Sequence, residues 1–149
     1  MRLALYQPDQ AGNVGTILRL AACLGVAVDV IEPCGFTFSD RALKRAGMDY
    51  QTLAKVSRRA DWGAFEAGVE GRIVLFTTCA DVMLPGAAFE PDDVLLFGSE
   101  SRGVPADVHA RADVRVRIPM VAEARSLNIA VSAGIGLAEA LRQTGGWPR

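Results

Sequence analysis

The sequence contains very little histidine and cysteine. His109 is the single histidine among 149 residues, which argues against His-rich metal sites and the HExxH motif. The three cysteines, Cys23, Cys34 and Cys79, are an odd number without CxxC spacing, so we expect reduced and mostly buried thiols. A P-loop is also missing. We therefore expect no bound metal and disfavour an ordinary metalloenzyme.

The sequence also lacks a strong charge of either sign and any long apolar run. The formal net charge of −1 gives no overall basic field that would indicate a nucleic-acid partner. No apolar run approaches the roughly 20 residues of a membrane-spanning helix. The apolar stretch within MRLALYQPDQ is too short for a signal peptide. We expect a cytoplasmic protein that does not associate with membranes.

What the sequence does contain is apolar residues in short runs. Half of the residues are hydrophobic and the mean hydropathy is +0.21, which favours buried contacts between subunits. Strands are predicted at Arg2–Tyr6, Val26–Ile31, Arg72–Thr77, Val94–Phe97 and Val114–Ile118. Helices are predicted at Val14–Leu24, from a Ser39 cap to Arg45, at Asp61–Ala67 and at Leu127–Arg142. This alternation predicts one α/β domain, residues 1–149, with a mostly parallel sheet flanked by helices.

Three strand ends carry unusual polar residues. They are the segments from Tyr6 to Asn13, from Phe97 to Gly103 and from Ile118 to Asn128. Ligands in open α/β sheets bind outside the carboxyl ends of the strands, so this convergence indicates a site. Gly134-x-Gly136 lacks the third glycine of a dinucleotide fingerprint and does not follow a strand, so it carries little weight.

Each of these segments also has a purely structural interpretation. Arg19, on the first helix, either binds a phosphate or is a solvated residue on the polar face of an amphipathic helix. The Gly98–Gly103 loop fits ligand contact and loop architecture about equally well. Ser126 is expected to cap the final helix and to place Asn128 in its first turn, where it faces either a ligand or the core.

Two surfaces indicate partners. The final helix is apolar almost all round, which in so short a chain favours burial against another subunit. Between Arg41 and Arg59 there are six basic side chains and one acidic residue, Asp49, so this stretch is either a solvated face or a phosphate-binding patch.

Taken together, these motifs resemble those of the SPOUT methyltransferases, the trefoil-knotted, S-adenosylmethionine-dependent RNA methylases. The matching segments are LYQP, NVGTILR, IEPCGF, RAGMDY, LLFGSESRGVP and IPMVAEARSLNIAVS, in order along nearly the whole chain. The short length and the IEP-x-GF and AG-x-DY segments are most similar to the small tRNA wobble-nucleotide 2′-O-methyltransferases. Departures are Gln10-Ala11-Gly12 where relatives commonly have prolines, and Leu127 where methionine is frequent.

The resemblance implies a C-terminal trefoil knot, a homodimer and methyl transfer from S-adenosylmethionine to a tRNA anticodon stem-loop. The methyl acceptor is the ribose 2′-hydroxyl of cytidine 34, or a modified uridine there. Implied catalytic residues are Arg19, Asn128 and Glu100. Implied cofactor-binding residues are Phe76, Thr77, Gly98, Ile118, Ser126 and Leu127. Implied substrate-binding residues are Asn13, Arg19, Arg41, Lys44 and Arg45.

Alternatives stay open at this point. The same enzyme class acting on ribosomal RNA or on another tRNA position differs only in the methylated nucleotide. A catalytically silent, dimeric RNA-binding protein would bind cofactor without turnover. A nucleotide-binding oxidoreductase would need the dinucleotide fingerprint that the sequence lacks.

Overall fold

The computed structural model describes residues 1–45 and 55–149, without the side chains of Asp40, Leu43 and Arg45. The AG-x-DY segment therefore lies outside the described residues, as does the side chain of Arg45. The elements are β1 Arg2–Tyr6, α1 Ala11–Leu24, β2 Ala27–Ile31, α2 Asp40–Arg45, β3 Val56–Arg59, α3 Trp62–Glu66, β4 Ile73–Phe76, β5 Val82–Met83, a 3-10 turn at Leu84–Gly86, β6 Val94–Phe97, α4 Ala106–Arg111, β7 Val114–Arg117 and α5 Ile129–Thr144.

In the described part of the chain the strands form one seven-stranded sheet of order β3-β2-β1-β6-β4-β7-β5. Every pair of named strands within it is parallel, so the predicted parallel sheet is confirmed. Because the strands are parallel, the loops that follow β1, β6, β4 and β7 emerge at the same edge. The strand order makes these four strands neighbours, so the three polar segments singled out in the sequence meet there.

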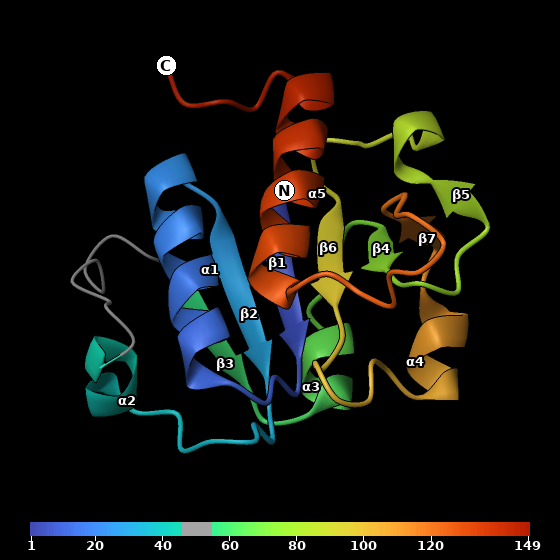
Figure 1. The fold of residues 1–149 in the computed structure, drawn as a ribbon. Helices are drawn as coiled ribbons and strands as arrows, with labels where there is room; N and C mark the ends of the chain where they lie inside the picture. Colours follow the sequence, from blue (N-terminus) through green and yellow to red (C-terminus); the bar gives the residue numbers. More distant parts are fainter. Residues whose placement is uncertain (46–54) are drawn as a thin grey trace.

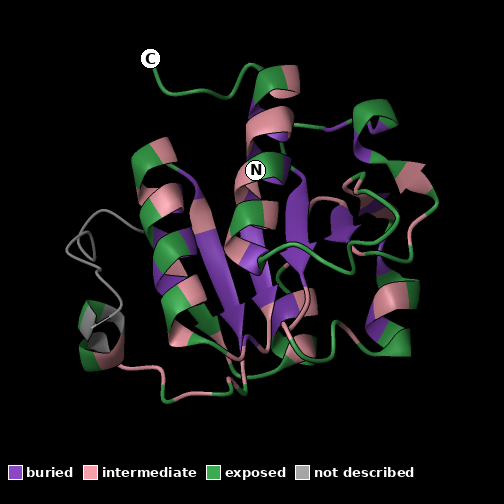
Figure 2. Cartoon of the chain, in the orientation of Figure 1, coloured by how far each residue is buried: buried purple, intermediate pink, exposed green. Residues whose placement is uncertain are grey.

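Helices cover both faces of the sheet (Figure 1). α1 and α5 pack side by side on one face, over a core that includes Leu3, Leu5 and Val116. α3 and α4 lie against the other face, where Phe65 and Val108 pack on the alternate strand residues. The central strands are buried along their whole length, as continuous apolar runs predict (Figure 2).

The predicted strands agree with the structure within one residue at each end, but four short elements were missed, among them the 3-10 turn at Leu84–Gly86. β3 carries the polar sequence VSRR at the edge of the sheet, β5 has two residues, and α4 has six. α1 begins three residues before the predicted start, and Gly25 ends it in the left-handed conformation. The expectation of mostly buried cysteines was wrong, because two of the three free thiols are exposed and the third is partly so.

Three further expectations concern membrane spans, the trefoil knot and the burial of the final helix. No helix among the described residues is long and apolar enough to cross a membrane. The trefoil knot stays a prediction. The final helix buries only one of its apolar faces, because Val131 and Ile135 on its outer side are 50% and 39% exposed.

A buried carboxylate fastens the edge of the sheet. Asp29 in β2 is 2% exposed and forms ion pairs with Arg2 at 2.9 Å and with Arg59 at 2.7 Å. These arginines belong to β1 and β3, the two neighbours of β2, so one carboxylate joins three adjacent strands. A buried charge needs such partners, since leaving it unpaired is strongly destabilising.

The two glycines of α5 differ in what surrounds them. A Cβ atom on Gly136 would lie 2.5 Å from Cζ of Phe76, whereas a Cβ on Gly134 would meet nothing closer than Leu20 Cδ2 at 3.9 Å. Gly136 is therefore needed for α5 to lie close to β4, and the Gly-x-Gly pair has a packing role.

We expect Gly136→Ala to lower the free energy of unfolding by about 1–3 kcal/mol through overpacking. Gly134→Ala should leave it unchanged or raise it by up to about 1 kcal/mol, because alanine favours the helix. Urea denaturation of both variants measures the difference. Equal effects would show that Phe76 does not restrict the packing of α5.

Candidate active site

A cavity of about 470 Å³ lies at the carboxyl edge of the sheet, within the range of roughly 300–1,000 Å³ for small-molecule sites. Its walls come from the loops that follow β4, β6 and β7, together with the start of α1. Predicted site residues that line it are Asn13, Phe76, Thr77, Gly98, Glu100, Ile118, Ser126, Leu127 and Asn128. The structure thus brings together every residue predicted to bind cofactor.

The loop after β6 closes tightly on itself. Ser99 and Gly103 exchange two backbone hydrogen bonds, of 3.0 and 2.9 Å. A Cβ atom on Gly98 would lie 2.6 Å from the carbonyl carbon of Gly103, and Gly103 has a φ of +66°. Both glycines are therefore required by the loop itself. The close return of the chain also leaves the cavity open above Gly98, which lines it.

Glu100 is held by the loop that follows β1. Its two carboxylate oxygens accept hydrogen bonds from the backbone N–H of Asp9 at 2.7 Å and from the side-chain amide of Asn13 at 3.1 Å. A carboxylate that accepts from two donors on the β1–α1 side fastens the loop after β6 to that segment. Its observed contacts are structural.

Asp9, in the loop after β1, makes a second contact with the loop after β6. It was not among the predicted site residues. Its carboxylate accepts hydrogen bonds from the backbone N–H of Ser101 at 2.9 Å and from the Ser101 hydroxyl at 2.6 Å. These bonds lower the pKa of Asp9 below its ordinary value. The signal available in the sequence was the polar strand end after Tyr6, which indicated a site without specifying this residue.

Asn128 joins the third loop to the other two. Its amide nitrogen donates to Oδ1 of Asn13 at 3.0 Å. Its own Oδ1 accepts from the backbone N–H groups of Ala130 and Val131, so Asn128 is the N-cap of α5. The prediction that Ser126 caps this helix was wrong, because the chain stays in an exposed loop until Asn128 satisfies the free N–H groups.

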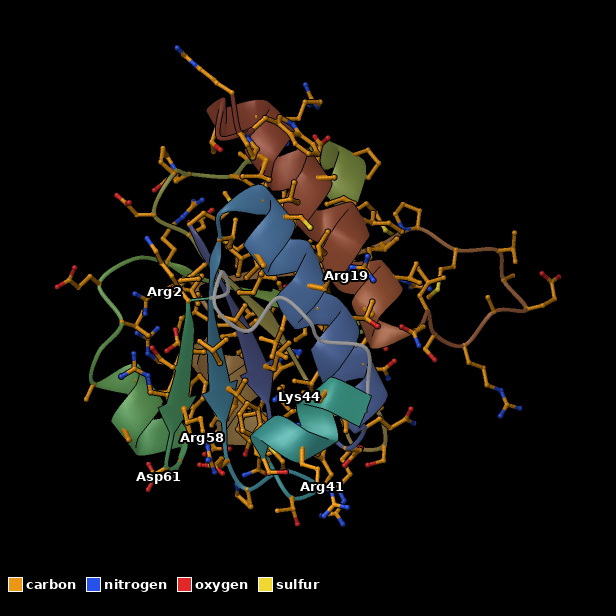
Figure 3. All side chains as sticks on the ribbon, turned by 90° about the vertical axis from the view of Figure 1, so that its left-hand side faces the viewer. Arg2, Arg19, Arg41, Lys44, Arg58 and Asp61 are labelled. Atoms are coloured by element: carbon orange, nitrogen blue, oxygen red, sulfur yellow. The ribbon has the colours of Figure 1, made fainter. Side chains whose placement is uncertain are left out.

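Of the predicted substrate residues, Asn13 lines the cavity, whereas Arg19, Arg41 and Lys44 do not. Arg19 is exposed on α1, six residues beyond Asn13 and thus about 9 Å further along the helix. Arg41 and Lys44 are exposed on α2, on the same side of the molecule as Arg19 (Figure 3). Apart from Asn13, the predicted substrate residues thus lie on an exposed surface and not in the cavity lining.

Two arginines also line the cavity. Arg125 comes from the exposed loop before α5, and Arg117 from the end of β7. Nε of Arg117 is buried and has no hydrogen-bond partner among the described residues. Its neighbour Arg115 instead donates to the carbonyl oxygens of His109 and Ala112, at 3.1 and 3.0 Å. No cluster of His, Cys, Asp or Glu able to hold a metal is found in the part of the chain that is described.

Comparison with known proteins identifies the family. Residues 1–138 match the SpoU rRNA Methylase family. The chain belongs to this family. The tRNA (cytidine(34)-2′-O)-methyltransferase of Beijerinckia indica is 53% identical over 146 residues, which cover 96% of this chain and 91% of that one.

Solved structures agree with this assignment. A solved structure from a study of the 2-OH methylation of C/U34 on tRNA is 40% identical to this chain. Its TM-score is 0.90, and the match covers 95% of this chain and 94% of that one. An AdoMet-bound rRNA methyltransferase from Sinorhizobium meliloti is 29% identical, with a TM-score of 0.84 over 95% of this chain and 55% of that one. The SPOUT family and its fold class, as predicted from the sequence, are confirmed.

The contacts of Glu100 can be tested by stability. We expect Glu100→Ala to lower the free energy of unfolding by about 1–3 kcal/mol, because two hydrogen-bond donors lose their acceptor. Glu100→Gln should cost less, since one amide oxygen remains to accept. Chemical denaturation measures both variants, with Glu123→Ala in the exposed 118–128 loop as the control. An effect of Glu100→Ala no larger than that of the control would contradict the assigned role.

Proposed function

We propose that this chain transfers a methyl group from S-adenosylmethionine to the ribose 2′-hydroxyl of the tRNA wobble nucleotide, cytidine 34 or a modified uridine. The observation that carries this proposal is the cavity built from three interlocked loops in a member of the SpoU family. The 53% identical relative that bears this activity in its name supports the choice of nucleotide.

The cavity suits the cofactor in several respects. Apolar side chains of Phe76, Ile118 and Leu127 line it and offer a surface for adenine, while Gly98 leaves its backbone accessible. Thr77 and Ser126 add hydroxyl groups. We assign these six residues to cofactor binding. When bound, the cofactor would supply a methyl group on a positively charged sulfur; its transfer to the ribose oxygen would break the S–CH3 bond, leave a neutral thioether and release the hydroxyl proton to solvent.

The residues around the cavity are suited to positioning more than to proton transfer. Arg19 carries a guanidinium that stays protonated, so it stabilises the developing negative charge on the ribose oxygen or holds the adjacent phosphate. Asn128 and Glu100 hold the loops in register through Asn13. Positioning of this kind supplies much of the rate enhancement in a two-reactant transfer.

The RNA is assigned to the surface next to the cavity. Arg41 and Lys44 are exposed on α2, on the side that also carries Arg19 (Figure 3). Arg45, which was also predicted to bind the substrate, is assigned to the same RNA contact. Exposed cations on this side of the molecule would give phosphate contacts that place an RNA without reading its sequence. The proposed partner is the tRNA anticodon stem-loop, and we propose a cytoplasmic location for the enzyme.

Transfer of labelled methyl groups into total tRNA from cells that lack this protein tests the proposal. We expect label at the 2′-O position of nucleotide 34 on nucleoside mapping. Arg19→Ala should lower kcat by about 100-fold or more, as loss of a charge-stabilising donor does. Its affinity for S-adenosylmethionine should be retained in calorimetry.

The other outcomes each change the proposal. Label at another tRNA position or in ribosomal RNA would keep the reaction and move the target. Cofactor binding without transfer to any RNA would indicate a silent RNA-binding protein. Loss of cofactor affinity in Arg19→Ala would assign Arg19 to the structure of the site.

We also propose that the enzyme is a homodimer formed through α5. Val131 and Ile135 lie one turn apart on its outer face, are apolar and are 50% and 39% exposed. Such a pair next to α1 provides an apolar strip that a second copy would cover.

A double variant, Val131→Glu with Ile135→Glu, should convert the dimer to a monomer in sedimentation velocity, because two carboxylates would be buried in the contact. Met83→Glu is the matched control, since Met83 is 49% exposed on β5 at the far edge of the sheet. A wild-type monomer, or a dimer that tolerates both glutamates, would contradict the proposal.

A further inference from the structure

Three side chains form a layered stack beside the start of α2. The rings of Phe36 and Phe38 have centroids 6.2 Å apart and planes inclined by 29°. The guanidinium carbon of Arg58 lies 4.8 Å from the centroid of the Phe38 ring. Phe36 and Phe38 are partly buried against the core under α1 and α5. The layers thus run outward from the core and end in a guanidinium group.

Arg58 is held in place on two sides. Its guanidinium carbon lies over the Phe38 ring, and Nη2 forms an ion pair of 2.5 Å with Glu32. Its side chain is nevertheless 50% exposed. With Phe38 on one side and Glu32 on another, the exposed part of the guanidinium is the part directed away from both. Arg58 therefore presents a flat, fixed, half-neutralised cation to solvent.

The stack is connected to the active site through the loop after β2. Gly35 donates a backbone hydrogen bond of 2.9 Å to the carbonyl of Pro8, and a Cβ on Gly35 would lie 2.9 Å from Cα of Asp9. Asp9 in turn holds Ser101 in the loop after β6. A displacement of the stack would therefore be transmitted to the loops around the cavity.

The pKa of Cys34 is a second indication that the stack and the loops around the cavity are close. Burial, followed by the charges of Glu32 and Glu100, raises the pKa of Cys34 to about 11, while Arg58 opposes the shift. One thiol is thus within electrostatic range of both the stack and the cavity loops. Arg58 lies at the same carboxyl edge of the sheet as the cavity, because it pairs with Val30 near the end of β2.

We propose that the open face of Arg58 stacks on a nucleobase of the single-stranded RNA loop that carries the methylated nucleotide. Unpaired bases bind proteins by stacking on aromatic rings and on arginine planes. A phosphate contact fits less well, because phosphates bind the in-plane N–H groups and Glu32 already occupies one edge and offsets the charge. This inference rests on the proposed function and specifies how that site recognises its RNA.

Arg58→Lys is the informative variant, because it keeps the charge and removes the plane. The substrate is an anticodon stem-loop RNA with 2-aminopurine placed in turn at each loop position next to nucleotide 34. We expect the wild-type protein to quench one of these probes by stacking and Arg58→Lys to lose that quenching. The KM for this RNA should rise about 10-fold, as loss of one stacked base implies, with kcat and cofactor affinity unchanged. Phe38→Leu, which removes the supporting ring, should act in the same direction.

The matched control is Arg111→Lys, which alters an ion-paired, 39% exposed arginine on α4, across the sheet from α1. It should leave quenching and KM unchanged. Unchanged quenching and KM in Arg58→Lys would overturn the inference and assign a simple charge contact instead. Absence of any probe quenched by the wild type would also overturn it. If the wild type quenches a probe but methylates a different nucleotide, the proposed target is wrong while the stacking contact stands.

Discussion

The active site depends on a short chain of hydrogen bonds that joins three loops. Glu100 accepts from Asn13, Asn13 accepts from Asn128, and Asn128 caps α5. The loops after β1, β6 and β7 are thereby fastened at one point on the rim of the cavity. Each bond contributes only about 1 kcal/mol to stability. Their combined effect is to fix the cavity before a ligand arrives, which lowers the entropic cost of binding.

The parallel sheet explains why so few side chains suffice. Strands β1, β6, β4 and β7 are neighbours and run in the same direction, so their following loops are already close before any side chain joins them. The side chains then need only to set the register between loops. Asp29 does the same at the edge of the sheet, where it ties β1 and β3 to β2. The stack on Arg58 is therefore attached to the same rigid sheet as the cavity.

The sequence predicted the elements whose residues carry strong apolar patterns, and the loops at their ends. It missed β3 because an edge strand with sequence VSRR has no continuous apolar run, and its pairing with β2 is set by tertiary structure. It placed the cap of α5 at Ser126, since two candidate capping residues stand two positions apart and only the packing of the helix selects Asn128. Asp9 was missed because its partner, Ser101, is 92 residues away.

Net charge was a poor guide to the RNA partner for a reason visible in the ion pairs. The two buried acidic residues in the described part of the chain bind arginines that have structural roles. Asp29 holds Arg2 and Arg59, and Asp93 holds Arg72 at 2.9 Å. The net charge of −1 therefore counts these internal ion pairs together with the exposed cations of α2. For a nucleic-acid partner the relevant quantity is the charge on the face beside the cavity, because screening confines each charge to about 10 Å. The exposed cations Arg41 and Lys44 therefore matter more for an RNA partner than the total charge of the chain does.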